Sequence, residues 1–183
     1  MNNLIQIKGK ILYIYETPKN KHLLLRIGCG ANVLSCFITD DKIKEQFSEY
    51  KVGDYINLSG NIQSSRRYSE KEQKIVNTQI TFVDNIIPPQ YVDKGFYNRF
   101  WLNGTVSEIR ELNNCLKITV RTDNDGRISF VPVTFYYPDV RLLNFEIGER
   151  IQTQGCVQSV RKIDRNGNHK YFQNYVGSQH HTG

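Results

Sequence analysis

The sequence predicts an all-β protein with one short helix, in which one structural unit is used twice. The stretch Lys51–Ser64, KVGDYINLSGNIQS, recurs at Glu146–Ser159 as EIGERIQTQGCVQS, with an offset of 95 residues and no gap. The same offset carries Gly9 onto Gly104. Two anchors that share one offset indicate an internal repeat. Much of the remaining chain alternates apolar and polar residues, a period of two that is typical of half-buried strands.

Before the repeated stretch, the first half contains three strand-like segments and one helix-like segment. We expect the strands at residues 4–15, 23–27 and 33–38. Residues 39–50 carry apolar side chains at positions i, i+4 and i+7, and Thr39, Asp40 and Asp41 each offer an N-cap. A short helix is therefore expected between the third and fourth strands.

The repeated stretch begins with a turn, continues as a strand and leads into a basic hairpin. The hairpin spans residues 64–74 in the first copy and 161–170 in the second, and a further strand follows each of them. A glycine inside each strand, Gly60 or Gly155, predicts a bend, a bulge or the close approach of another backbone. Residues 138–145 of the second half are short and poorly patterned, so we expect no full helix there.

This order of turn, glycine-containing strand, basic hairpin and returning strand resembles the last two strands of an OB-fold. In particular, it resembles the bacterial single-stranded DNA-binding protein family. The resemblance covers both halves and implies two tandem OB-fold barrels of five strands each. The domains expected from it are residues 1–85 and 99–177, with a linker at 86–98 and a disordered tail at 178–183.

The chain departs from this family at its end. Members usually end in a flexible acidic segment with an apolar tip that recruits partner enzymes, whereas this sequence ends VGSQHHTG. We therefore do not expect recruitment of partners through such a tail. A chain that carries two barrels needs fewer subunits, and its origin in a phage or plasmid is a hypothesis.

The charge of the chain is positive and evenly distributed. Lys and Arg number 24 against 18 Asp and Glu, and the isoelectric point is near 9.1. Each half contains 12 basic and 9 acidic side chains, so each half has a net charge of +3. This balance suits a polyanion partner, and it equally suits a mildly basic soluble protein.

The two basic hairpins are the best candidates for contact with nucleic acid. Binding of a single strand needs positive charge along the phosphates and aromatic faces on which bases stack. The alternative is that an exposed hairpin is charged whatever its role. The resemblance favours binding, because this hairpin contacts nucleic acid in the family. The expected contact residues are Arg66, Arg67, Tyr68, Lys71 and Lys74 in the first hairpin, and Arg161, Lys162, Arg165, His169, Lys170 and Tyr171 in the second.

Three further aromatic residues have two interpretations each. The offset places Trp101 on Gln6, on the strand face opposite the apolar residues, so we expect Trp101 outside its barrel core. It either stacks on a base or packs against the other domain or a second subunit. Tyr13 and Tyr15 either line a groove or fill the barrel mouth, and we favour the barrel mouth.

Enzyme chemistry is not expected. The sequence has no phosphate-binding glycine loop, nucleophile elbow or HExxH motif, and its four histidines have no metal-ligand spacing. The four cysteines never form a CxxC pair, which favours reduced thiols in a cytoplasmic protein over a disulfide or zinc framework. No apolar run approaches the ~20 residues of a membrane span, and the N-terminus lacks the cleavage site of a signal peptide. We expect no cofactor, no metal and no membrane contact.

The sequence thus predicts a protein that binds single-stranded DNA with little sequence preference, in replication, recombination or the transfer of phage or plasmid DNA. An RNA-binding OB-fold protein is one alternative. A structural or assembly protein that uses OB barrels for protein contacts is another. Association of copies as a homo-oligomer is left open. The second hairpin contains fewer acidic residues, so we expect it to contribute more of the affinity.

Overall fold

The computed structural model describes residues 2–69, 73–88, 95–136, 144–163, 167 and 169–182. For residues 66, 67, 69, 74–77, 162, 169–171 and 179–182, the description is limited to the backbone. The strands of the first half are β1 (Asn3–Glu16), β2 (Leu23–Cys29), β3 (Asn32–Ile38), β4 (Tyr55–Ser69) and β5 (Lys74–Ile87). Those of the second half are β6 (Tyr97–Leu112), β7 (Cys115–Asn124), β8 (Arg127–Tyr136), β9 (Arg150–Ile163) and β10 (His169–Thr182).

The strands β1 to β5 close into a barrel. β1 pairs with β2, β2 with β3, β3 in parallel with β5, β5 with β4, and β4 again with β1. The helix α1 (Asp41–Phe47) connects β3 to β4, and the Asp40 carboxylate caps it by accepting from two backbone amides. This pairing order, with a helix after the third strand, is that of an OB-fold. The predicted fold class, all-β with one short helix and a five-stranded barrel, is confirmed.

The strands β6 to β10 form a second ring of pairings in the same order. β6 pairs with β7, β7 with β8, β8 in parallel with β10, β10 with β9, and β9 again with β6. Residues 137–143, which include most of the segment where no full helix is expected, lie outside the described residues. Below, the rings are called barrel 1 (β1–β5) and barrel 2 (β6–β10).

The internal repeat of the sequence is a repeat of backbone geometry. In β1 and β4, Ile5 pairs with Gly60, and in β6 and β9 the residues 95 positions later, Phe100 and Gly155, pair in the same way. A Cβ atom added to either glycine would lie 1.9 Å from a carbonyl oxygen of the returning strand. The predicted close approach of another backbone is confirmed at both glycines, so no larger residue fits there.

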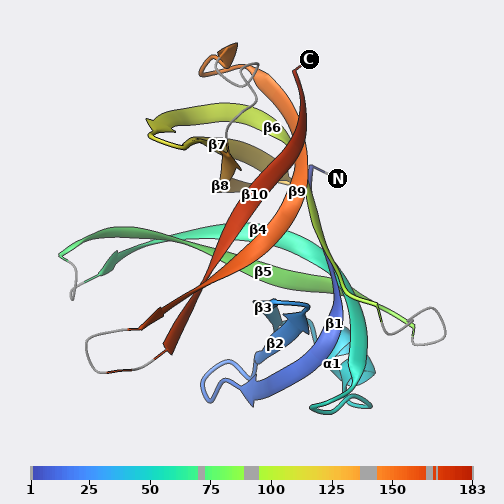
Figure 1. Cartoon of the computed structure of the whole chain (residues 1–183). Helices are drawn as coiled ribbons and strands as arrows, with labels where there is room; N and C mark the ends of the chain where they lie inside the picture. The colour runs from blue at the N-terminus through green and yellow to red at the C-terminus, as the bar shows by residue number, and fades with distance from the viewer. Residues whose placement is uncertain are drawn as a thin grey trace.

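The two barrels are joined edge to edge by β1 and β6. Residues Asn3–Lys8 pair antiparallel with Tyr97–Leu102. Ile5 faces Phe100, the residue that the repeat makes its equivalent, so a pseudo-two-fold axis passes through this pair. Figure 1 shows β1 and β6 meeting side by side, and it shows the two long hairpins, β4–β5 and β9–β10, crossing between the barrels.

In each half, an asparagine on the first strand bonds to the neighbouring strand of the same barrel; Asn3 is buried and Asn98 is half-buried. The Asn3 side chain donates to the carbonyl oxygen of Ile62 (2.6 Å) and accepts from its amide (3.0 Å). Asn98 makes the equivalent pair with Val157, at 2.5 and 2.8 Å. Both contacts follow the 95-residue offset. At this point the first strand no longer pairs with its neighbour. The asparagine side chain takes the place of the missing backbone partner, so the amide and carbonyl of Ile62 and of Val157 remain hydrogen-bonded.

The ends of the expected domains differ from the structure. β5 continues to Ile87 and β6 begins at Tyr97, so the expected linker is shorter by strand residues at both ends. The tail expected to be disordered at 178–183 belongs to β10 as far as Thr182, where it pairs with Ile151. Strand pairing uses the backbone, so β9 holds this polar segment although it has no apolar pattern. No described helix is long and apolar enough to span a membrane.

We predict that the substitution Asn3→Ala lowers the free energy of unfolding by about 1–3 kcal/mol, because it leaves the buried amide and carbonyl of Ile62 without partners. Asn98→Ala should act in the same direction and by less, since Asn98 is only half-buried. Urea denaturation followed by circular dichroism measures both. The control is Asn85→Ala, at an exposed strand position. Equal losses in all three variants would contradict this role.

Candidate nucleic-acid interface

A row of apolar and aromatic side chains crosses the outer face of barrel 1. Tyr15 lies opposite Leu24, Leu24 opposite Phe37, and Phe37 opposite Phe82, so the row spans β1, β2, β3 and β5. The rings of Phe37 and Phe82 are 6.2 Å apart. The face of the second and third strands is where OB-folds bind oligonucleotides. The row therefore offers flat surfaces where a nucleic-acid ligand of this fold would lie.

A bulge in β1 turns two tyrosines toward this face. The pairing register shifts between Ile11 and Tyr13, and the extra residue reverses which side chains point inward. Ile11 is buried, whereas Tyr13 and Tyr15 are 41% and 43% exposed. Their rings stack at 6.4 Å, and the guanidinium of Arg26 lies 5.1 Å from the centre of the Tyr13 ring. The expectation that these tyrosines fill the barrel mouth is therefore wrong.

Barrel 2 carries a different chemistry at the equivalent row. The pairings there run from Arg110 to Lys117, then to Thr134 and to Val176, across β6, β7, β8 and β10. A bulge between Val106 and Glu108 sits 95 residues after that of β1. The row that is aromatic and apolar in barrel 1 thus holds two cations and two smaller residues in barrel 2.

The charges of barrel 2 are partly balanced. The Arg110 guanidinium forms an ion pair of 2.6 Å with Glu108. No ion pair within 4 Å is found for Lys117 or Arg121 in the described part of the chain. Arg121 is exposed and lies across from Phe130, which is 44% exposed. This face therefore combines positive charge with the exposed ring of Phe130.

Each long hairpin lies against the face of the opposite barrel. In hairpin β4–β5, the Ser64 hydroxyl accepts from the Phe130 amide of barrel 2 (2.9 Å). In hairpin β9–β10, the Ser159 hydroxyl accepts from the Val33 amide of barrel 1 (3.0 Å), and the Gln173 side chain donates to the Ser35 carbonyl oxygen (2.9 Å). Ser64 and Ser159 are the last residues of the repeated stretch.

A groove follows the contact between hairpin β4–β5 and barrel 2. Its volume is about 220 Å³. Its walls come from β5 on one side and from β6, β7 and β8 on the other. The lining residues are Gln79, Glu108, Arg110, Lys117, Thr119, Phe130 and Pro132.

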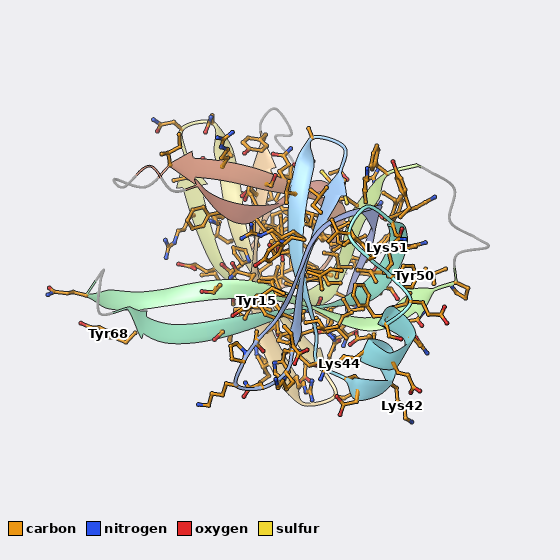
Figure 2. All side chains as sticks on the ribbon, turned by 90° about the horizontal axis from the view of Figure 1, so that it is seen from below. Tyr15, Lys42, Lys44, Tyr50, Lys51 and Tyr68 are labelled. Carbon is orange, nitrogen blue, oxygen red and sulfur yellow. The ribbon has the colours of Figure 1, made fainter. Side chains whose placement is uncertain are left out.

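The predicted hairpin residues are placed to different extents. Tyr68 is 62% exposed and lies toward the tip of hairpin β4–β5, far from the lysines of α1 (Figure 2). Arg161 is exposed on β9. Lys71 and Arg165 lie outside the described residues. For the others only the backbone is described, within β4, β5, β9 and β10, so their contacts stay predictions: Arg66, Arg67, Lys74, Lys162, His169, Lys170 and Tyr171.

Trp101 lies outside the barrel core, as the repeat predicts. It is half-buried on β6, between Leu4 of β1 and Gln154 of β9. Its indole N–H donates to the Gln154 side chain (2.9 Å), and its ring stacks with Tyr97 at 6.4 Å. It therefore sits on the sheet that joins the barrels, and its role as a stacking platform or a packing residue stays a prediction.

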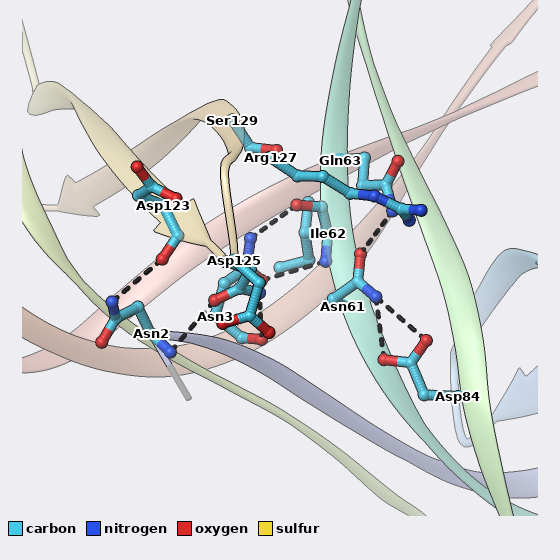
Figure 3. Close-up of a pocket in the computed structure, with 11 residues that line it drawn as sticks. Asn2, Asn3, Asn61, Ile62, Gln63, Asp84, Asp123, Asp125, Arg127 and Ser129 are labelled. Carbon is cyan, nitrogen blue, oxygen red and sulfur yellow. Dashed lines mark hydrogen bonds between the residues drawn. The ribbon is translucent and has the colours of Figure 1, made fainter.

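A polar cavity of about 580 Å³ lies where barrel 1 meets the β7–β8 turn (Figure 3). The Asp84 carboxylate accepts two hydrogen bonds from the Asn61 side chain, and the Asp123 carbonyl oxygen accepts one from Asn2. No group of three or more potential metal ligands occurs among the described residues. The bond from Asn2 to Asp123 links the segment before β1 to barrel 2, whereas the bonds from Asn61 to Asp84 lie within barrel 1.

Two buried thiols are chemically inert. Burial raises the pKa of Cys29 and that of Cys36 to about 12, because the thiolate would lose its hydration. Both thiols are therefore protonated near neutral pH, and a protonated thiol is a poor nucleophile.

We predict that a thiol reagent at pH 8 modifies the half-buried Cys156 of the folded protein and leaves Cys29 and Cys36 unmodified. Mass spectrometry of peptides after timed labelling measures the rate at each cysteine. Labelling in urea provides the control, in which all four cysteines should react. Equal rates at Cys36 and Cys156 in the folded protein would contradict the burial of Cys36.

The fold has similar solved structures, whereas the sequence has no match. A deletion mutant of the single-stranded DNA-binding protein from Thermus aquaticus is similar over 99% of this chain and 94% of its own, with a TM-score of 0.70 and 12% identity. The wild-type form of that protein is similar over 99% and 92%, with a TM-score of 0.66 and 10% identity. No family model matches the sequence, and no curated protein does. At this identity, the likeness establishes the fold.

Sequence reasoning missed most of the residues on the two faces. Strand alternation could have placed some of them, because Phe37 and Lys117 point away from buried neighbours such as Cys36 and Ile118. Their grouping depends on pairings between distant strands. The residues missed are Leu24, Arg26, Phe37, Phe82, Arg110, Lys117, Arg121 and Phe130.

Proposed function

We propose that this protein binds single-stranded DNA with little sequence preference. The observation that supports the proposal most is the row of outward-facing side chains that occurs at equivalent positions in the two barrels. The row is aromatic and apolar in barrel 1 and cationic in barrel 2, and it lies on the face where OB-folds take up oligonucleotides. The solved structures of similar fold come from a single-stranded DNA-binding protein, which supports the same choice of ligand.

The two rows suggest two kinds of contact with one strand. Bases would stack on Tyr15 and Phe37 of barrel 1, and each stacked base contributes roughly 1–3 kcal/mol. Phosphates would lie near Lys117 and Arg121 of barrel 2. Stacking accepts any base and phosphate contacts carry no sequence information, so the binding would be largely independent of sequence.

Such a protein would protect exposed strands during replication, recombination or the transfer of DNA. In this proposal the protein acts in the cytoplasm by binding alone, without catalysis. The net charge of +6 would help to attract the polyanion.

We predict that the affinity for a fluorescent poly-dT oligonucleotide falls steeply as salt rises. Each phosphate contact with a single strand contributes about −0.7 to the slope of log K against log salt. The double substitution Lys117→Gln and Arg121→Gln should make the slope shallower by about 1.4. Lys42→Gln is the matched control, because Lys42 is exposed on α1, away from these faces. Fluorescence anisotropy at several salt concentrations measures the slopes.

We further predict that Tyr15→Ala weakens binding by about tenfold or more and leaves the salt slope unchanged, because it removes a stacking surface without changing charge. The same anisotropy titration measures this effect. Competition with an RNA oligonucleotide of matched length tests the choice of ligand. Absence of binding at low salt would refute the proposal, and stronger competition by RNA would change its ligand to RNA.

A further inference from the structure

The two hairpins contact the opposite barrels through equivalent serines. Ser64 pairs with Gln79 within hairpin β4–β5, and Ser159 pairs with Gln173 within hairpin β9–β10. Ser64 binds the amide of Phe130, and Ser159 binds the amide of Val33. The same kind of hydrogen bond, from a backbone amide of the third strand of one barrel to a serine of the other hairpin, therefore occurs twice.

The glutamines make contact on the same sides. Gln173 donates to the carbonyl oxygen of Ser35 on barrel 1, and Gln79 lines the groove beside Phe130 on barrel 2. Ser64 and Gln79 therefore both lie against barrel 2. Each hairpin thus leaves its own barrel and runs beside the candidate binding face of the other, as Figure 1 shows for both.

The next basic position on each hairpin follows from the strand period. Successive side chains of a strand alternate between its faces, so residues two apart share a face. Position 66 therefore shares a face with Ser64, and position 161 with Ser159. Both positions hold arginine, and the 95-residue offset relates them. Positions 66 and 161 therefore belong to the strand face that Ser64 and Ser159 turn toward the opposite barrel.

We propose that each hairpin completes the nucleic-acid site of the opposite barrel: Arg161 acts with the aromatic row of barrel 1, and Arg66 acts with the cationic face of barrel 2. This inference rests on the proposed binding of single-stranded DNA. A strand bound on either face touches both halves of the chain. The two sites therefore form one interlocked unit, and each barrel alone holds only part of a site.

Double-mutant cycles in the full-length protein test this inference. The substitutions Tyr15→Ala and Phe130→Ala each truncate a ring on one face, and Arg161→Ala and Arg66→Ala each remove one hairpin arginine. Anisotropy with a short labelled oligo-dT gives Kd for the four single and the four double variants. Groups that touch the same ligand segment couple, whereas distant groups act additively.

We expect coupling of at least about threefold in Kd for the pairs Tyr15 with Arg161 and Phe130 with Arg66, which cross between barrels. The pairs Tyr15 with Arg66 and Phe130 with Arg161 serve as matched controls and should be additive. Coupling confined to these control pairs, or additivity in all four, would overturn the inference while leaving DNA binding intact. A wild-type protein that binds no oligonucleotide would refute the proposed function itself.

Crosslinking provides a second test that requires no substitution. A short oligo-dT with one photoreactive 5-bromodeoxyuridine is irradiated on the wild-type protein, and the modified peptides are identified by mass spectrometry. One position of the reactive base should give crosslinks to β1–β3. When the base is moved by one nucleotide from that position, we expect crosslinks to β9–β10. Crosslinks to β4–β5 in place of β9–β10 would overturn the inference.

Discussion

Six residues of β1 pair with six residues of β6, and this joint determines how every other part of the molecule is placed. The joint covers one edge of β1 and one edge of β6. Without it, the backbone groups along these edges would be unpaired and exposed to solvent. Because the central pair joins Ile5 to its repeat equivalent, the halves are related by a pseudo-two-fold axis. The axis directs each hairpin across the other barrel, where Ser64 and Ser159 bind it.

The backbone features of the two halves are conserved between copies, while the exposed chemistry differs. The crowded glycines, the asparagines that bond to the neighbouring strand and the first-strand bulges all recur at the 95-residue offset. These features satisfy backbone geometry, which side-chain changes on the outer face leave untouched. Barrel 2 can therefore hold Arg110 at the position where barrel 1 holds Tyr15, and the backbone of the barrel stays the same.

The sequence supports prediction of the fold because its signals are local. Alternation identifies the strands, Asp40 and the Phe47 stripe identify the helix, and Gly60 and Gly155 mark the crowded positions. The outer faces are harder to predict, because they depend on one extra residue. A strict period of two places Tyr13 and Tyr15 with Ile11, whereas the bulge at Leu12 turns them outward. The polar end of β10 gives no signal at all, since only the backbone of β9 holds it there.

The joint between the barrels is intramolecular, and this changes how the assembly responds to dilution. In a homodimer, a two-fold joint separates as concentration falls, and the same residue must serve on both sides of it. Here the two sides are tethered at a fixed effective concentration, so the interlocked faces persist however dilute the protein is. Different residues can also meet at the axis, as the small Ile5 does with the large Phe100. Tethering thus gives each half the freedom to specialise.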